Sequence, residues 1–421
     1  MNVDNIVFLN DNLNIRAGGP CGYIANLKKA MDKYISNDNV VFISKDNLPE
    51  AISNSCEKHT FRKIITKALT FYIPVKKYRR ELRQKLSFLL SSKKERVDYL
   101  EIDAKDYTGY AEILNNYNFK TITCHSTRDA IFIKNYLKSQ QKQAKLLLMS
   151  HSPELPSQER YHVEKQNGNK QAEKIYKIWQ QIEQKAFNSA DILVFPTKEA
   201  MEPYINGADY FNDLIKNKEV QFITTGCEKI DIQSSSVDIR KDYHITTKYI
   251  VSFIGRHTEI KGYNKLKEIA EKILNEREDV TFVIGGAQTN EFAPLSHPRW
   301  IELGRINPAD LLKITDLFIL PNKQTYFDLI LLEVLSAGVP VLASNTGGNK
   351  SVYQATHAIE LYDSNEDCIS KVNKFLDLAD KDKEEKRKLS IQAYENNYTL
   401  EHFAKNYDAL VKRVANLGEG K

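Results

Sequence analysis

The 421-residue sequence has no long apolar run and no beginning of the kind found in exported proteins. A transmembrane helix needs roughly 18 consecutive apolar residues, and no segment reaches that length. A secretory signal has a basic start followed by an extended apolar stretch, whereas this chain opens with MNVDNIVFLNDN. We therefore expect a cytoplasmic protein.

Cysteine is scarce, and the five cysteines lie far apart in the sequence. No two of them form a C-x-x-C pair, which argues against structural zinc and disulfides and favours a reducing compartment. The sequence also has no H-E-x-x-H motif, no Cys/His cluster and no D-x-D directly after a predicted strand. We therefore expect neither a bound metal nor another cofactor.

Charge of one sign is not in large excess, because the formal net charge is only +5. Such a balance does not by itself require a nucleic-acid partner, and no nucleic-acid-binding module is recognisable. Apolar residues make up 42% and charged residues 27% of the chain, which is typical of a globular protein. The length exceeds that of one ordinary core, so we expect two or three domains.

Short apolar runs alternate with amphipathic stretches along most of the chain. The first series of runs covers 5–9, 40–44, 119–124, 145–150, 191–195 and 220–224. The second series covers 249–255, 280–286, 317–321 and 339–344, and a charged helix is expected over 365–389. Strand–helix alternation predicts parallel sheets with helices on both faces.

These two series predict two doubly wound α/β domains joined by a polar linker. We expect an N-terminal domain over 1–230, a linker over 231–248 and a second domain over 249–396. The last segment, 397–421, has helical periodicity, and we expect it to return to the N-terminal domain. In such sheets, ligands bind beyond the carboxyl ends of the strands.

Two of the loops that follow strands have features of anion-binding sites. Gly18 and Gly19 stand where the first strand gives way to a helix, so backbone N–H groups could approach an anion there. A simple tight turn would use the same glycines. Arg256 and Lys261 follow the first strand of the second series, and two such cations suit a diphosphate. Solvated surface cations are the alternative.

A third feature is the carboxylate of Glu333, inside an otherwise apolar helix predicted over 328–337. A carboxylate among apolar neighbours is costly unless it is paired or hydrogen-bonded. Vicinal hydroxyl groups, such as those of a ribose, would be suitable partners. Alternatively, Glu333 could lie on a helix face that points to water.

Three segments in a fixed order resemble the motifs of a known enzyme family. They are AGGPCG (17–22), GRHTEIKG (255–262) and TYFDLILLEVLSAGVPVLASNTGG (325–348). The segments are similar to the G-G turn, the G-R-x-x-x-x-K-G motif and the E-x-F-G-L-x-x-L-E-A-M-A-x-G-x-P-V-I-A-S-x-x-G-G motif of retaining GT-B glycosyltransferases of family 4. This resemblance implies two Rossmann-like domains that face a central cleft. It also implies transfer of a sugar from a nucleotide diphosphate sugar, which we expect to be UDP-linked.

The resemblance assigns roles to particular residues. Arg256 and Lys261 would hold the donor diphosphate, Glu333 would bind the ribose, and His151 would touch the donor sugar. Asp328 completes the expected catalytic set, while His125 is expected to be structural. The expected donor-binding residues are Gly18, Gly19, Gly285, Gly286, Arg305, Ile306, Thr325, Phe327, Leu329 and Glu333.

The sequence departs from the family pattern at three positions of this last motif. Thr325 replaces the first glutamate, Asp328 replaces a glycine, and Ser351 replaces a glutamate after the double glycine. Asp328 could supply a replacement acceptor for sugar hydroxyls from the same loop. The departures leave open a second class of function, a non-catalytic GT-B partner or scaffold of another glycosyltransferase. A nucleotide-sugar epimerase of similar fold is a weaker third reading.

One segment of the first half, residues 61–96, is strongly basic. It contains twelve Lys or Arg residues against two Glu residues, with apolar side chains interleaved. Such a stretch is typical of a surface that meets anionic lipid, although a packed helix with one solvated face would look similar. This stretch favours peripheral contact with the cell membrane. Together with it, the resemblance implies a glycan or lipid-linked acceptor and a role in cell-surface polysaccharide synthesis. A homo-oligomer is compatible with the sequence.

Overall fold

The structure is a computed structural model that describes residues 1–13, 19–35, 39–49, 107–235, 237–289 and 292–416. Gly18 and the basic segment 61–96 lie outside the described residues, so their expected roles remain predictions. Within the described ranges, no helix is both long enough and apolar enough to cross a bilayer.

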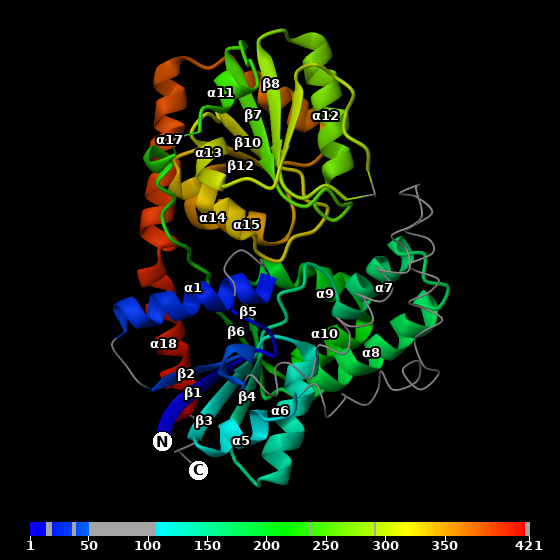
Figure 1. The fold of residues 1–421 in the computed structure, drawn as a ribbon, viewed down its shortest axis with the longest axis vertical. Coiled ribbons are helices and arrows are strands. Elements are labelled where there is room, and N and C mark those ends of the chain that lie inside the picture. The colour runs from blue at the N-terminus through cyan, green and yellow to red at the C-terminus, as the bar shows by residue number, and fades with distance from the viewer. Residues whose placement is uncertain (14–18, 36–38, 50–106, 236, 290–291, 417–421) are drawn as a thin grey trace.

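The N-terminal half forms a sheet of six parallel strands in the order β2-β1-β3-β4-β5-β6 (Figure 1). Its strands are β1 (Asn2–Phe8), β2 (Val40–Ile43), β3 (Asn118–Cys124), β4 (Lys145–Leu148), β5 (Ile192–Phe195) and β6 (Glu219–Phe222). The helices around it are α1 (Gly19–Tyr34), α5 (Tyr110–Asn115), α6 (Thr127–Ser139), α7 (Pro156–Gln166), α8 (Ala172–Ser189), α9 (Glu202–Gly207) and α10 (Asp209–Lys216). Every residue of β5 is buried, as expected where helices cover both faces of a parallel sheet.

The second half forms another parallel six-stranded sheet, in the order β12-β11-β10-β7-β8-β9. Its strands are β7 (Tyr249–Ile254), β8 (Val280–Gly285), β9 (Trp300–Gly304), β10 (Leu317–Leu320), β11 (Val341–Ser344) and β12 (Ile359–Tyr362). A short helix, α11 (Ile239–Asp242), lies within the expected linker, and the helices that follow are α12 (Tyr263–Glu276), α13 (Pro308–Leu312), α14 (Leu329–Ser336), α15 (Gly347–Thr356), α16 (Asn365–Leu376) and α17 (Asp380–Asn397). The predicted pair of doubly wound α/β domains is therefore confirmed.

Two details of the second domain differ from the sequence-based expectation. The strands β9 and β12 were not expected, because both lie at edges of the sheet and include half-buried residues instead of a continuous apolar run. The single helix expected over 365–389 is wrong, because α16 ends at Leu376 and α17 begins at Asp380. Ala379 between them has an extended backbone, with φ −62° and ψ 150°.

The final helix, α18 (Leu400–Asn416), packs against α1, β1 and β3 of the first domain. The Tyr407 hydroxyl of this helix accepts a hydrogen bond from Asn5 Nδ2 at 2.8 Å and donates one to Thr123 Oγ1 at 3.1 Å. Figure 1 shows α17 and α18 running one after the other along one side of both domains. The end of the chain thereby links the two domains a second time.

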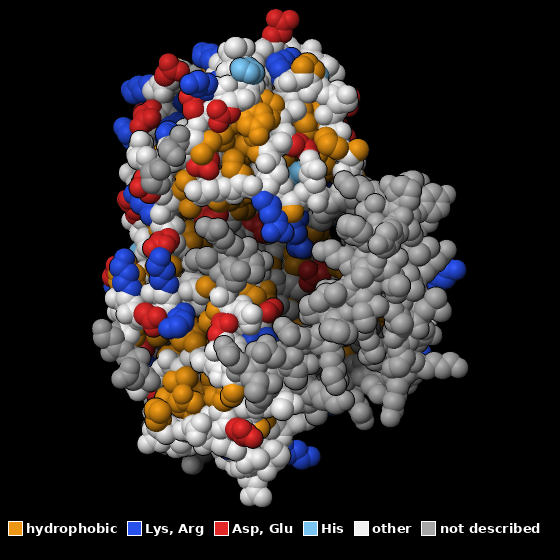
Figure 2. Space-filling model, viewed as in Figure 1, with side chains coloured by type: hydrophobic (Ala, Val, Ile, Leu, Met, Phe, Trp, Pro, Cys, Tyr) orange, Lys and Arg blue, Asp and Glu red, His pale blue; other side chains and the backbone are white. Residues whose placement is uncertain are grey.

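The loops after the strands of one sheet meet the loops after the strands of the other. The 3₁₀ turn η6 (Glu199–Met201), which follows β5, packs against α15, which follows β11. Parallel strands place all their carboxyl ends at one edge, so the two carboxyl edges face each other. The surface is hollowed between the two domains, and basic and acidic side chains line this hollow (Figure 2).

Candidate functional site

The loop after β7 is held against the loop after β10 by close backbone packing. Gly262 has a left-handed backbone, with φ +70°, and a Cβ atom at this position would lie 1.6 Å from the Pro321 carbonyl oxygen. The Lys323 N–H donates to the Ile260 carbonyl at 3.0 Å. Only glycine satisfies both conditions at position 262. The packing carries Lys261 into the space beside α14.

The side chain of Lys261 forms an ion pair with Asp328. Its Nζ lies 2.5 Å from Asp328 Oδ1, and the side chains are only 20% and 15% exposed. The second carboxylate oxygen, Oδ2, accepts a hydrogen bond from Asn322 Nδ2 at 2.9 Å. Lys261 was expected to hold the donor diphosphate, and this role stays a prediction. In the structure, a carboxylate of the same domain balances its charge.

Arg256 differs from Lys261, although both belong to the same loop. Its side chain is exposed, and no hydrogen bond or ion pair to it occurs in the part of the chain that the structure describes. The next residue, His257, is buried and stacks on Tyr263 with ring centroids 4.1 Å apart. The loop therefore turns one side chain inward and leaves the neighbouring guanidinium available to a ligand.

The buried side chains next to this loop contact a buried carboxylate whose role the sequence did not reveal. Glu302 on β9 accepts hydrogen bonds from the Tyr263 hydroxyl and from Trp300 Nε1, the latter at 3.1 Å. Gln288 Nε2 donates to its other oxygen at 2.5 Å, and His257 Nδ1 lies 3.8 Å away. Burial lowers the pKa of His257, although the charge of Glu302 acts in the opposite direction. The only signal in the sequence was a glutamate two residues after Trp300, in an edge strand that the apolar pattern did not predict.

The glycines after β8 bring three loops together. Gly286 has φ +126°, and a Cβ atom there would lie 1.9 Å from the Gly255 carbonyl oxygen. A Cβ atom on Gly285 would lie 2.9 Å from Ile306 Cγ2. Ile306 is half-buried, whereas Arg305 is exposed. The residues expected to frame a base thus converge at the ends of β8 and β9.

Glu333 lies in the middle of α14 and is half-buried. The surrounding residues Leu331, Leu332, Val334 and Leu335 are buried. Among the described residues, none donates a hydrogen bond to the Glu333 side chain or forms an ion pair with it. Burial raises the pKa of Glu333 to about 7. An unpaired carboxylate in this position is suited to accept hydrogen bonds from hydroxyl groups of a ligand.

The two histidines at the ends of β3 and β4 form a direct pair. His125 Nδ1 lies 2.7 Å from His151 Nε2, and the rings stack with centroids 5.0 Å apart. Burial lowers the pKa of His151 to about 3, and burial followed by the neighbouring His151 lowers that of His125. Both rings are therefore neutral near pH 7, and the buried His125 Nε2 has no hydrogen-bond partner among the described residues. His125, expected to be merely structural, orients the histidine expected to touch a sugar.

Tyr326 joins the two domains beside this histidine pair. Its ring belongs to the second domain but packs against Phe195, Tyr204 and His151 of the first, with centroids 5.7 to 6.3 Å apart. Its hydroxyl donates to the Val194 carbonyl at 3.3 Å. The position is only 6% exposed. Tyr326 occupies the variable position of the E-x-F-G-L pattern, so the pattern predicts no particular role for this residue.

Polar contacts surround this aromatic anchor. Glu202 of the first domain lies 2.9 Å from Lys350 Nζ and accepts a 3.4 Å hydrogen bond from the Gly347 N–H. Ser351, where the family pattern has a glutamate, donates to either Thr197 or Glu199 across the interface, each at 2.6 Å. The replacement at 351 therefore serves the contact between the domains.

Thr325, Phe327 and Leu329 lie in the loop after β10 and at the start of α14. Thr325 is 1% exposed, and no described residue forms a hydrogen bond with its hydroxyl. Phe327 packs on the backbone at Gly348, where a Cβ atom would lie 2.9 Å from the Phe327 ring. Leu329 is the first residue of α14, and Gly19 is the first of α1, with φ +54°. No group of three or more His, Cys, Asp or Glu side chains suited to a metal occurs within the described ranges.

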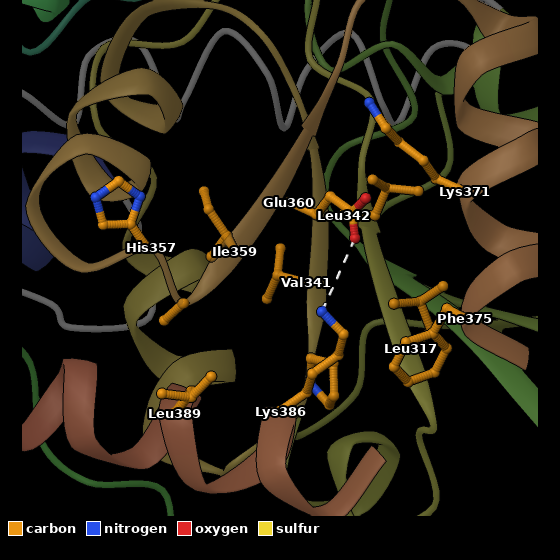
Figure 3. A pocket seen from close by; sticks show the side chains of 12 residues that line it. Leu317, Val341, Leu342, His357, Ile359, Glu360, Lys371, Phe375, Lys386 and Leu389 are labelled. Atoms are coloured by element: carbon orange, nitrogen blue, oxygen red, sulfur yellow. Dashed lines mark ion pairs between the residues drawn. The ribbon is translucent and has the colours of Figure 1, made fainter. Parts of the chain in front are cut away.

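A separate pocket lies at the opposite end of the second sheet. Leu317, Val341 and Ile359, at the amino ends of β10, β11 and β12, line it, and the Glu360–Lys386 ion pair spans 4.0 Å beside it (Figure 3). Because ligands of doubly wound sheets bind at the carboxyl ends of the strands, this pocket is not the candidate site.

Comparisons with known proteins agree with the fold. Residues 248–377 match the family model of glycosyl transferases group 1. N-acetyl-alpha-D-glucosaminyl L-malate synthase of Bacillus anthracis is 26% identical over 155 residues, which are 34% of this chain and 40% of that protein. The chain spans about half, or less, of the length of the curated relatives that it matches.

Solved structures match over nearly the whole chain. Sucrose-phosphate synthase from Thermosynechococcus elongatus superposes with a TM-score of 0.65 at 14% identity, over 98% of this chain and 100% of that one. A UDP-forming alpha,alpha-trehalose-phosphate synthase from Burkholderia vietnamiensis superposes with a TM-score of 0.64 at 13% identity, over the full length of both chains. The predicted GT-B fold is confirmed.

Burial of Glu333 predicts a pH-dependent stability. The folded-state pKa of about 7 lies above the ordinary 4.5, so the folded protein binds this proton more tightly than the unfolded chain does. The free energy of unfolding should therefore fall as the pH rises from about 4.5 to about 7, by at most about 3 kcal/mol for this group. Glu333→Gln should remove that fall, and denaturant unfolding at pH 4, 6 and 8 measures it. An equal fall in Glu333→Gln would contradict the assignment, and Glu271→Gln, at an exposed glutamate, should behave like the wild type.

Tyr326 should hold the two domains together. Tyr326→Ala removes a ring buried at the interface, and loss of a buried aromatic costs about 3 to 5 kcal/mol. The polar contacts between the domains are half-exposed and offset little of this lost stability, because exposed ion pairs contribute about 1 kcal/mol or less. Small-angle scattering should show a larger radius of gyration with unchanged circular dichroism. Tyr353→Ala, at an exposed position of α15, is the control. Identical scattering of the wild type and Tyr326→Ala would refute this role.

Proposed function

We propose that this protein is a retaining glycosyltransferase. It would move a sugar from a nucleotide diphosphate sugar to the hydroxyl group of a glycan or lipid-linked acceptor. The family match supports this proposal because the matched residues, 248–377, include Arg256, Lys261 and Glu333. UDP is the proposed nucleotide, since one solved structure of the same fold belongs to a UDP-forming synthase.

The observation that carries the proposal is that no described residue pairs with the Glu333 carboxylate in α14. A ribose offers two adjacent hydroxyl groups that would donate to it and thereby offset the cost of its burial. The diphosphate attached to that ribose would extend toward the start of α14. There it would meet the helix N-terminus, Lys261 and the exposed Arg256.

The proposed reaction breaks the anomeric C–O bond and forms a C–O bond to the acceptor. Negative charge builds on the diphosphate as that bond breaks, so preorganised cations stabilise the transition state. The acceptor attacks on the face that the leaving group departs from, and its proton passes to the departing phosphate oxygen. No nucleophile from the protein is needed, and His151 would contact the sugar as a neutral ring.

A non-catalytic partner of another glycosyltransferase is the second candidate. Two observations favour it: Asp328 already neutralises Lys261, and Thr325 offers a buried hydroxyl where the family pattern has a carboxylate. Such a protein would keep the fold and the contact between its domains without turning over a donor. Binding of anionic vesicles through residues 61–96, measurable by sedimentation, is compatible with either candidate.

The two candidates predict different behaviour toward UDP-sugars. The enzyme should bind UDP in calorimetry and slowly release UDP from a UDP-sugar. Lys261→Ala and Arg256→Ala should each reduce that release about 100-fold, as expected when one charge-stabilising group is removed. Lys272→Ala, which removes an exposed cation of α12 in an i,i+4 pair with Glu276, should leave it unchanged. If no nucleotide sugar binds at millimolar concentration, the scaffold is the correct candidate.

A further inference from the structure

Asp328 places a negative charge inside the proposed diphosphate site. Its carboxylate lies 2.5 Å from Lys261 Nζ, which is the distance of a charge-assisted hydrogen bond. The family pattern has glycine at this position, so the carboxylate is a feature of this chain. Any anion that approaches Lys261 meets a residue whose charge is already balanced.

The orientation of the carboxylate is fixed by buried neighbours. Asn322, which donates to its second oxygen, is 2% exposed. The Asn322 carbonyl in turn accepts a 2.7 Å hydrogen bond from Ser344 Oγ at the end of β11. Asp328 is therefore not a mobile surface group that happens to be near a lysine. The domain core sets its position.

The Asp328 carboxylate also does not cap the helix that it precedes, although capping is the usual role of an aspartate at a helix start. Asp328 is the N-cap residue of α14, with φ −78° and ψ 121°, but its side chain makes no capping hydrogen bond. The N-cap residues Ser126 and Ser364 do cap α6 and α16 in this way. Capping is the preferred use of aspartate at this position. The first N–H groups of α14 therefore remain available to a ligand, while Asp328 neutralises Lys261.

We propose that Asp328 is an internal competitor of the donor diphosphate for Lys261. The proposal rests on the proposed function and refines it. A nucleotide must displace the carboxylate from Lys261 or bind with both negative charges close together. In either case, Asp328 weakens diphosphate binding, and its removal strengthens it. Asp328 would then set the affinity of the site and would not act as the expected replacement acceptor for sugar hydroxyls.

The test compares Asp328→Asn with the wild type by calorimetric titration of UDP and of inorganic pyrophosphate. Asparagine keeps the shape of the side chain and removes the charge, so both ligands should bind roughly tenfold more tightly. This gain should shrink at high salt, because screening weakens an electrostatic competition. A purely structural role of Asp328 would not produce a gain that depends on salt.

Asp377→Asn is the matched control. Asp377 also pairs with a cation of the second domain, Arg277, at 2.7 Å, but it follows the last residue of α16 and is 66% exposed. Asp377→Asn changes the net charge by the same amount as Asp328→Asn, but it should leave the affinities for UDP and pyrophosphate unchanged. Thermal unfolding of both variants verifies that they are folded.

The outcomes separate this inference from the proposed function. If the wild type binds UDP and Asp328→Asn binds it equally or more weakly, Asp328 positions Lys261 and the inference is wrong. If UDP binds neither protein but pyrophosphate binds Asp328→Asn more tightly, the inference stands and the nucleotide proposal fails. If neither ligand binds either protein, both are refuted.

Discussion

The packing of Tyr326 into the first domain is the contact on which the candidate site depends. This ring lies among Phe195, Tyr204 and His151, so the loop after β10 is held against the loops after β4 and β5. Burial of a large aromatic is worth more than the half-exposed Glu202–Lys350 pair beside it. The ring thereby keeps the carboxyl edges of the two sheets opposed, with the histidine pair on one side and α14 on the other.

Three carboxylates near this interface have different environments, and the differences indicate different roles. Glu202 is paired with Lys350 and joins the domains, while Asp328 is paired with Lys261 and lowers the positive charge of the proposed site. Glu333 alone has no partner among the described residues, and its burial is costly. A ligand with hydroxyl groups offsets that cost directly. Under the proposals above, a ligand with phosphates would also have to compete with Asp328 for Lys261.

The sequence predicted the parts of the fold that depend on continuous apolar runs. Central strands such as β5 and β8 are buried on both faces and are visible without any tertiary information. The edge strands β9 and β12 have half-buried residues and left no such run. The sequence also did not predict the break between α16 and α17, because charged residues with helical spacing continue on both sides of the break.

The candidate site was predictable as a set of loops but not as a set of contacts. Glycines and cations after strands are local signals, and in the second domain the loop after β7 does contact those after β8 and β10. Lys261 and Asp328 are 67 positions apart, and Tyr263 and Glu302 are 39 apart, so neither pairing can be read from spacing. The His125–His151 pair was missed for the same reason: each histidine ends a different strand.

A crystal structure of the protein with UDP tests the central claim most directly. The claim predicts ribose hydroxyl groups within hydrogen-bond distance of the Glu333 carboxylate, about 3 Å, and the diphosphate against Lys261 and the first N–H groups of α14. It also predicts that Asp328 has moved away from Lys261 or lies beside the phosphates. A nucleotide bound elsewhere, with Glu333 still without a partner and the Lys261–Asp328 pair intact, would contradict the account.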